Sequence, residues 1–186
     1  MRIQTENFMI DIETMGQTAN AAILSIGMVR FDINNGVTDT FYSRVDLQSC
    51  IDQGLSIDAS TIKWWLKQED DARAEITLDA PRLIDVLIKL SNWLYDACEH
   101  PVIWGNGSDF DNTILANAHQ KCGLPLPWKY YNNRCYQTVK NLFPNISMNR
   151  IGTHHNALDD AESQALHLIE ILKQHNFQGD SHKLIL

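Results

Sequence analysis

The sequence contains few features that would indicate zinc, disulfides or a membrane. Its four cysteines include no C-x-x-C pair, and His119 and Cys122, three residues apart, have no matching second pair. Because structural zinc sites usually need two such pairs, we expect free thiols. No apolar run reaches the length of a membrane span, and residues 1–7 have no apolar core of the signal-peptide kind. We therefore expect a cytoplasmic protein without a membrane partner.

Positive charge is also scarce. The chain has 15 Lys and Arg against 23 Asp and Glu, which gives a formal charge of −8 at pH 7. This balance argues against a broad basic surface that covers duplex DNA. It does not exclude nucleic acid, because divalent cations bound at one site would focus positive charge there.

The rest of the composition is ordinary for a globular protein, with 44% hydrophobic and 20% charged residues among 186. This length suits one domain with a sizeable core, and no internal repeat or linker-like tract divides the chain. We expect a single domain over residues 1–186, in which residues 177–186 form a frayed tail.

Two acidic residues follow an apolar run near the N-terminus. The run, residues 8–10, is typical of a buried strand, and Asp11 and Glu13 come next. Alternate residues of a strand face the same side, so both carboxylates project together. Their repulsion would be relieved by a hard divalent cation such as Mg²⁺ or Mn²⁺. Taken alone, a D-x-E pair is more often two solvated acids on a surface strand.

Hydrophobic periodicity and turn residues predict an α/β fold that opens with a meander of strands. The next strands are predicted at residues 22–32, 37–45 and 101–104 and within 130–136, with a hairpin at Asn34-Asn35-Gly36. Helices are predicted from residue 58 and over residues 79–99, 109–123, 139–143 and 156–175. Residues 46–54 have an irregular pattern.

A second acidic motif lies where a predicted buried strand meets a helix, the usual place for a ligand site in an α/β sheet. It runs from Asn106 to Asp111. Asp109 and Asp111 could each cap the helix, and that structural role suits Asp109. Phe110 can anchor the turn in the core, which would leave Asp111 facing the cleft.

A third motif contains His155 and Asp160. Five residues turn an ideal helix by about 500°, so the two side chains would not share a helix face. They can act together only if His155 stands in the loop before the helix. Taken alone, His155 is more simply a surface histidine. We expect His154 to point elsewhere, because successive residues of an extended loop project in opposed directions.

The order and spacing of these three motifs resemble the DEDDh family of 3′–5′ exonucleases, within the ribonuclease H-like superfamily. The matching stretch runs from Asp11 to Ala161, most of the chain. The Trp64-Trp65 pair and residues 104–107 are similar to the branch with bacterial exoribonucleases and phage-type exodeoxyribonucleases. The resemblance implies a mixed five-stranded sheet flanked by helices.

The resemblance also implies a mechanism with two divalent metal ions, Mg²⁺ or Mn²⁺. Asp11, Glu13 and Asp160 would hold the first ion, and Asp11 would bridge to the second, which Asp111 would support. His155 would deprotonate the attacking water. Two such ions about 4 Å apart stabilise the attacking and leaving oxygens of a phosphodiester. The sequence places no basic residue to neutralise these acids.

The implied substrate is the single-stranded 3′ end of DNA or RNA, from which 5′-mononucleotides would be released. The residues expected to contact the terminal nucleotide are Thr14, Met15, Asn106, Phe110 and one of Trp64 and Trp65. Paired tryptophans can also be core residues, and for the pair as a whole we favour the core.

Two other functions use the same fold. An inactive nucleic-acid-binding module is disfavoured, because such copies usually lose an acid or the histidine and all five are present here. An endonuclease would differ by not requiring a free 3′ end. Sugar preference depends on contacts to the 2′-OH, which no motif identifies, and a homodimer remains open as the assembly.

Overall fold

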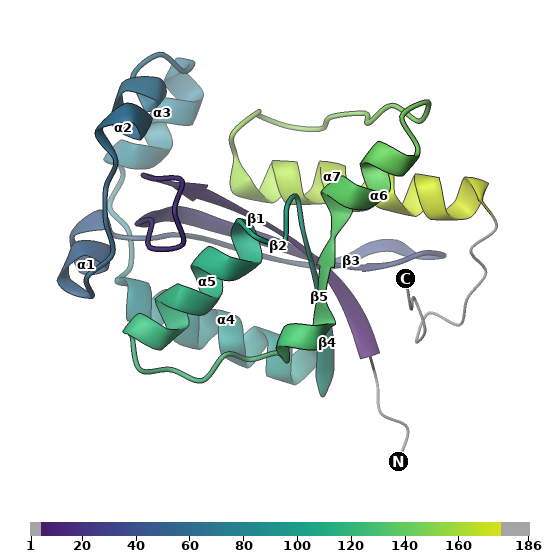
Figure 1. Cartoon of the computed structure of the whole chain (residues 1–186), viewed down its shortest axis with the longest axis horizontal. Coiled ribbons are helices and arrows are strands. Elements are labelled where there is room, and N and C mark those ends of the chain that lie inside the picture. Colours follow the sequence, from purple (N-terminus) through teal and green to yellow (C-terminus); the bar gives the residue numbers. More distant parts are fainter. Residues whose placement is uncertain (1–4, 176–186) are drawn as a thin grey trace.

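The computed structural model describes residues 5–175, apart from the side chains of residues 71 and 75. One five-stranded sheet, in the order β3-β2-β1-β4-β5, has helices on both faces (Figure 1). The predicted α/β fold with a mixed five-stranded sheet is confirmed. The tail predicted to fray, residues 177–186, lies outside the described residues.

The sheet combines an antiparallel meander with two parallel strands. Strands β1 to β3 form the predicted meander, and β4 and β5 continue the sheet in parallel from the other edge of β1. The strands are β1 (Thr5–Thr14), β2 (Ile23–Asp32), β3 (Gly36–Arg44), β4 (His100–Gly105) and β5 (Asn133–Cys135). All five overlap stretches that the sequence predicts as strands.

Seven α-helices and one 3₁₀-helix are found in the described residues. They are α1 (Leu47–Asp52), α2 (Ala59–Trp65), α3 (Asp70–Thr77), α4 (Leu83–Ala97), α5 (Asp111–Lys121), η1 (Tyr130–Asn132), α6 (Tyr136–Leu142) and α7 (Ala157–Gln174). Helix α1 falls where an irregular segment is predicted, and α3 is not predicted at all. Helix α1 has only six residues, and α3 is rich in polar residues, so neither shows a clear hydrophobic periodicity.

Two predicted helix starts are wrong by a few residues. Helix α4 begins at Leu83 rather than at Pro81, whose carbonyl instead accepts a 2.8 Å hydrogen bond from the Asp46 amide. Helix α5 begins at Asp111, and Phe110 is its N-cap residue without a side-chain capping bond. Asp109 therefore precedes the helix and does not have the predicted capping role.

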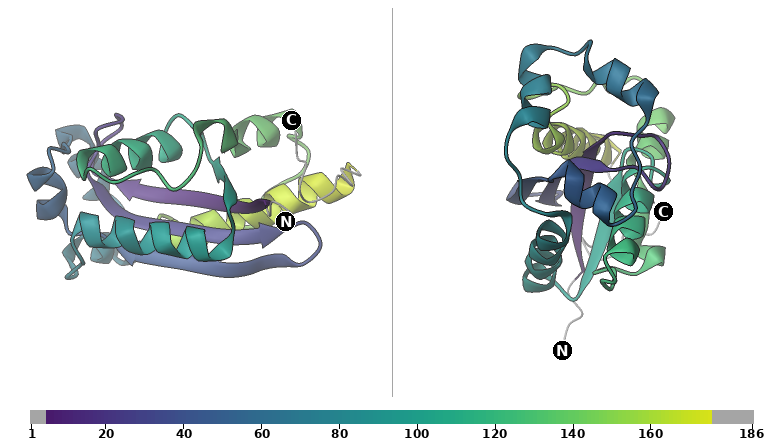
Figure 2. Two further views of the ribbon diagram at one scale, coloured as in Figure 1. Left: turned by 90° about the horizontal axis from the view of Figure 1, so that it is seen from below. Right: turned by 90° about the vertical axis from the view of Figure 1, so that its left-hand side faces the viewer.

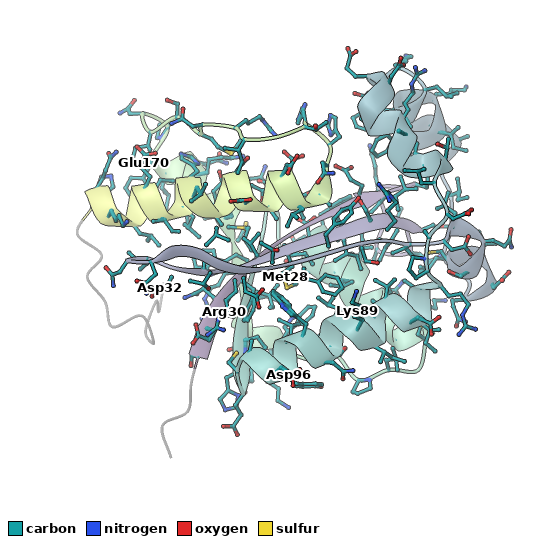
Figure 3. All side chains as sticks on the ribbon, turned by 180° about the vertical axis from the view of Figure 1, so that it is seen from behind. Met28, Arg30, Asp32, Lys89, Asp96 and Glu170 are labelled. Atoms are coloured by element: carbon teal, nitrogen blue, oxygen red, sulfur yellow. The ribbon has the colours of Figure 1, made fainter. Side chains whose placement is uncertain are left out.

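The alternation of side chains along β1 assigns the helices to the two faces of the sheet. Phe8, Ile10 and Ile12 belong to one buried cluster, which contains the apolar faces of α4 and α5. Met9 belongs to a second cluster with α6 and α7. Figure 2 shows the sheet between these layers, and in Figure 3 Glu170 on α7 and Lys89 on α4 lie on opposite sides of it. None of the described helices has the length and apolar character needed to cross a bilayer.

Gly27 on β2 allows α7 to approach the sheet closely. It pairs with Asp11 of β1, and a Cβ atom built on it would lie 2.2 Å from the backbone carbon of Ala157. Such a contact is far shorter than any real packing distance, so no larger residue fits without moving the helix. The close approach brings the first turn of α7 against the acidic end of β1.

The four cysteines are free thiols, as predicted. Cys50 and Cys98 are buried, and burial raises the pKa of Cys50 to about 12. These buried thiols serve as small core residues.

Candidate active site

Three carboxylates meet where β1 ends and α7 begins. Asp11 and Glu13 project from the same side of β1, and Asp160 comes from the first turn of α7. One oxygen from each lies within 4.8 Å of the others. The structure thus brings together residues almost 150 positions apart in the order that the sequence motifs predict.

The electrostatics of this group favour a bound cation. Removal from solvent is the main cause that raises the pKa of Asp11, and repulsion from Asp111, Glu13 and Asp160 adds to it. Burial, followed by repulsion from Asp160 and Asp111, raises the pKa of Glu13 to about 9. A divalent cation would bind the charged form of each oxygen and remove that repulsion. The residues present therefore fit a hard divalent ion held by oxygen ligands.

Asp111 lies beside this group and is held by the backbone. Its carboxylate accepts hydrogen bonds from the amides of Ile12, at 3.3 Å, and Asn106, at 3.1 Å. The β1–β4 pairing runs only as far as Ile10 and Gly105, so the side chain of Asp111 takes the place of a strand partner. Burial raises the pKa of Asp111 to about 7, although these backbone hydrogen bonds oppose the shift.

Two further side chains bind the carboxylates, and neither was predicted from the sequence. Gln164 Nε2 donates a 2.8 Å hydrogen bond to Asp11 Oδ1. Arg150 forms a salt bridge with Asp160, contrary to the expectation that no basic residue neutralises these acids. The position of Gln164 four residues after Asp160, on the same helix face, was a usable signal. No sequence pattern marks Arg150, because it lies in an irregular loop ten residues before Asp160.

His155 stands in the loop before α7, as predicted. Its backbone φ is 65°, its amide donates a 3.1 Å hydrogen bond to Asp160 Oδ2, and its ring Nδ1 lies 3.8 Å from Glu13 Oε1. Partial burial lowers the pKa of His155, and the neighbouring His154 lowers it further, while Asp160 opposes the shift. A lowered pKa keeps the imidazole neutral near pH 7, the form that can accept a proton.

The prediction that His154 points away from His155 is wrong. The two rings are stacked, with centroids 3.8 Å apart and planes inclined by 27°. The prediction assumed an extended backbone, whereas the left-handed conformation of His155 turns the chain. His154 remains exposed, while His155 is half-buried beside Glu13.

The structure also distinguishes Asp160 from its neighbour Asp159. Asp159 Oδ2 accepts a 2.7 Å hydrogen bond from the Thr153 amide and lies directly beside Gly152. Asp159 therefore holds the loop, while Asp160 joins the carboxylate group. This arrangement agrees with the five-residue spacing from His155.

A cavity of about 320 Å³ adjoins the carboxylates, between the end of β1 and α2. Its lining combines polar and aromatic side chains: Ile12, Glu13, Thr14, Gly16, Gln17, Ser60, Thr61, Trp64 and Phe110. We name it the β1–α2 cavity. Of the residues expected to contact a nucleotide, it brings together Thr14, Phe110 and Trp64.

The paired tryptophans have different surroundings. Trp64 is 42% exposed, lines the β1–α2 cavity and has its ring centroid 4.8 Å from that of His155, in an edge contact. Trp65 is 2% exposed, and its indole N–H donates a 2.9 Å hydrogen bond to the carbonyl of Thr14. Trp64 is therefore the tryptophan that a ligand in the cavity would touch, and Trp65 is a core residue.

Met15 does not lie at the nucleotide site predicted for it from the sequence. Its side chain is buried and borders an apolar cavity between α2 and α3, rather than the β1–α2 cavity. Its amide donates to Ala22 and its carbonyl accepts from Asp58. Because both backbone groups already have partners within the fold, we assign Met15 to the core.

Asn106 is exposed and lies after β4, outside the lining of the β1–α2 cavity. Lys140 Nζ donates a 3.3 Å hydrogen bond to its side-chain oxygen. Lys140 thus sets a positive charge beside Asn106, on the α6 side of the site.

Residues 6–172 match the family described as "3'-5' exoribonuclease Rv2179c-like domain". The chain belongs to this family. Membership implies divalent metal ions as cofactors, in agreement with the oxygen ligands found here.

A curated relative and two solved structures extend the comparison. The exodeoxyribonuclease of Enterobacteria phage T4 is 32% identical over an alignment of 124 residues that covers 60% of this chain and 54% of the relative. The chain thus matches about half of that protein's length. The nuclease domain of 3'hExo, a DEDDh family member bound to rAMP, superimposes with a TM-score of 0.64 at 15% identity, over 91% of this chain and 92% of that domain.

Exonuclease I of E. coli, in complex with a dT13 oligonucleotide, gives a TM-score of 0.66 at 11% identity, over 94% of this chain and 42% of the enzyme. At identities this low the two superpositions establish the fold alone. They confirm the ribonuclease H-like arrangement expected from the sequence motifs.

Proposed function

We propose that this family member is a 3′–5′ exonuclease that hydrolyses the terminal phosphodiester bond at single-stranded 3′ ends of nucleic acid and releases 5′-mononucleotides. The observation that carries the proposal is the meeting of Asp11, Glu13 and Asp160 within 4.8 Å, beside a half-buried histidine. Their carboxylates repel one another at a buried position, which favours metal ions as their partners.

The carboxylates would hold two Mg²⁺ or Mn²⁺ ions. Asp11, Glu13 and Asp160 would hold the first, and Asp11 together with the backbone-anchored Asp111 would hold the second. When bound, such ions polarise the phosphoryl oxygens and stabilise charge on the attacking and leaving oxygens.

His155 acts as the general base. The ring lies next to Glu13, so it faces the position where a scissile phosphate and an attacking water would meet. Its lowered pKa keeps it neutral, so it can take the proton of that water at neutral pH. The edge contact with Trp64 fixes the ring laterally.

The β1–α2 cavity receives the terminal nucleotide. Trp64 and Phe110 offer aromatic surfaces to its base, and base stacking of this kind tolerates any sequence. Thr14, at the end of β1, lines the cavity next to Glu13. Asn106, with Lys140 beside it, contacts the nucleic-acid strand from the α6 side of the site.

The relatives support nucleic acid as the substrate without deciding the sugar. The family is described by exoribonuclease activity, whereas the phage relative is an exodeoxyribonuclease. Of the two solved structures, one holds rAMP and the other a DNA oligonucleotide. The proposal therefore covers both DNA and RNA ends.

The proposal is tested by digesting matched single-stranded DNA and RNA oligonucleotides, labelled at the 5′ end, with Mg²⁺ or Mn²⁺. We expect a ladder that shortens from the 3′ end, and the relative rates give the sugar preference. Asp160→Asn serves as the inactive control.

Two results would contradict the proposal. Cleavage of a circular strand would indicate an endonuclease. Tight binding of the oligonucleotide with no hydrolysis in either metal would indicate an inactive binding module.

A further inference from the structure

Arg150 lies at the edge of the carboxylate group, and both its side chain and its backbone are only loosely held. Its guanidinium Nη1 donates to Asp160 Oδ1, and its side chain is 47% exposed. It lies in the segment between α6 and α7, so no helix or strand fixes its backbone. The side chain can therefore leave Asp160 without disturbing the fold.

Both oxygens of Asp160 have a donor in the protein. Oδ2 accepts from the backbone amide of His155, and Oδ1 accepts from Arg150. The amide belongs to the turn that positions His155 and is itself partly buried. When Asp160 serves as a metal ligand, Arg150 is the donor that can withdraw.

We propose that Arg150 exchanges partners during the reaction: it neutralises Asp160 in the metal-free protein and binds the phosphate of the terminal nucleotide once metal occupies the site. This inference rests on the function proposed above. It assigns a substrate-binding role to a residue that belongs to none of the three acidic motifs.

The chemistry of the guanidinium suits both partners. Its planar set of N–H donors matches carboxylate and phosphate oxygens equally well, and it stays charged throughout the working pH range. Asp160 is one of the carboxylates proposed to hold the ions, so a phosphate bound to those ions would lie next to the position that Arg150 occupies beside Asp160. A short swing of an exposed side chain is sufficient.

The exchange predicts effects of opposite sign on metal binding and on phosphate binding. In Arg150→Gln, Mn²⁺ no longer competes with the guanidinium, so Mn²⁺ should bind roughly three- to tenfold more tightly in the absence of nucleotide. With the metal site saturated, AMP should bind the variant about tenfold more weakly. Adenosine, which lacks the phosphate, should bind both proteins equally.

The experiment is isothermal titration calorimetry with Mn²⁺ alone, and then with AMP and adenosine at saturating Mn²⁺. Arg82→Gln is the matched control: it removes one positive charge from an exposed ion pair with Asp85, outside the carboxylate group. Arg150→Lys keeps the charge but loses the planar donors, so it should restore AMP binding only in part. It also separates charge from fold, should Arg150→Gln lose stability.

Weaker Mn²⁺ binding in Arg150→Gln would overturn the inference, because Arg150 would then merely hold Asp160 in place. Unchanged AMP binding would overturn it as well. Either result would leave the proposed nuclease intact, since the wild-type protein would still bind both ligands. A wild-type protein that binds no Mn²⁺ would instead overturn the proposed function and, with it, this inference.

Discussion

Two groups of side chains in the site differ in how firmly the protein holds them. Among the carboxylates, Asp111 is 3% and Asp160 8% exposed, and both accept backbone hydrogen bonds. Among the groups proposed to touch the nucleotide, Trp64 is 42% exposed and the side chain of Arg150, at the edge of the carboxylate group, is 47% exposed. The groups proposed for chemistry are thus fixed by the fold, whereas those proposed to touch the nucleotide retain freedom to adjust.

The difference has a physical cause. Buried carboxylates at short range are costly, so each needs a defined partner, and Gly27 brings α7 close enough to keep Asp160 in register with Asp11. A stacking surface needs no such partner, because its energy comes from contact area with a ligand. Substitutions in the first group should therefore abolish chemistry, and those in the second should weaken binding.

Asp11→Asn gives the largest expected effect and tests the carboxylate group. Hydrolysis should fall below detection while the fold is retained. Because one of the repelling charges is removed, the melting temperature in EDTA should hold or rise, and the increase produced by Mn²⁺ should shrink. Activity assays and thermal scans with and without metal measure both effects.

Asp160→Asn sharpens this test. It should be equally inactive, but its metal-free protein should gain less stability than Asp11→Asn, because the salt bridge with Arg150 is lost. Full activity in either variant would contradict the metal assignment.

Substitutions at the paired tryptophans test the difference between the fixed and the adjustable side chains. Trp65→Ala should cost about 3–5 kcal/mol of unfolding free energy, because it empties a buried site and removes the bond to Thr14. Trp64→Ala should keep most of the stability and lose about 1–3 kcal/mol of oligonucleotide binding. Chemical denaturation and fluorescence anisotropy separate the two quantities. If both variants only lose stability, Trp64 is not a stacking surface.

His155→Ala should lower the turnover rate by about 10²-fold or more while metal and substrate binding persist. His154→Ala should cost much less, but it removes a neighbour that lowers the pKa of His155. Since a base must be neutral, activity rises as pH passes through that pKa, and this rise should move to higher pH in His154→Ala. If His154→Ala abolishes activity and His155→Ala has only a small effect, His154 is the general base in place of His155.

The first motif was predictable from strand alternation, and the second and third from their resemblance to the motifs of the DEDDh family. Alternation along β1 places Asp11 and Glu13 on one side, and the five-residue spacing places His155 before α7 with Asp160 inside it. The sheet followed from apolar runs and the Asn34-Asn35-Gly36 turn, which β2 and β3 flank. Patterns that repeat at the period of a strand or helix carry this information.

The remaining features depend on tertiary contacts or single backbone angles. The positive φ of His155 turns the chain so that the ring of His154 stacks on that of His155. Neither residue type predicts a left-handed conformation at this position. Met15 is adjacent to the motif, but its amide and carbonyl are used by Ala22 and Asp58, which lie in separate segments. Arg150 reaches Asp160 from an irregular loop, where side-chain direction cannot be derived from spacing.

The smallest predicted effect is a pH dependence of stability in the metal-free protein. The pKa of Glu13 is about 9 in the fold against an ordinary 4.5, and that of Asp11 is raised as well. Between those values the folded state binds a proton that the unfolded state has released, so the free energy of unfolding falls as pH rises. The fall should be less than about 1.4 kcal/mol per pH unit for each group.

The window from about pH 7 to 8.5 lies above the range of the histidines. Within it the lowered pKa of Cys135 acts in the opposite direction, so the change of slope in Glu13→Gln is the readout. Histidines with lowered pKa values, such as His155 and His119, change stability only below about pH 6.5, and in the opposite direction.

Thermal denaturation in EDTA across the window should show falling stability, and saturating Mn²⁺ should flatten the slope, because the ion replaces the protons. Glu13→Gln should reduce the slope, whereas Asp109→Asn, an exposed carboxylate outside the group, should not. A slope that Glu13→Gln leaves unchanged would mean that the carboxylates are already charged without metal, and Arg150 would then be the stronger counter-ion of the site.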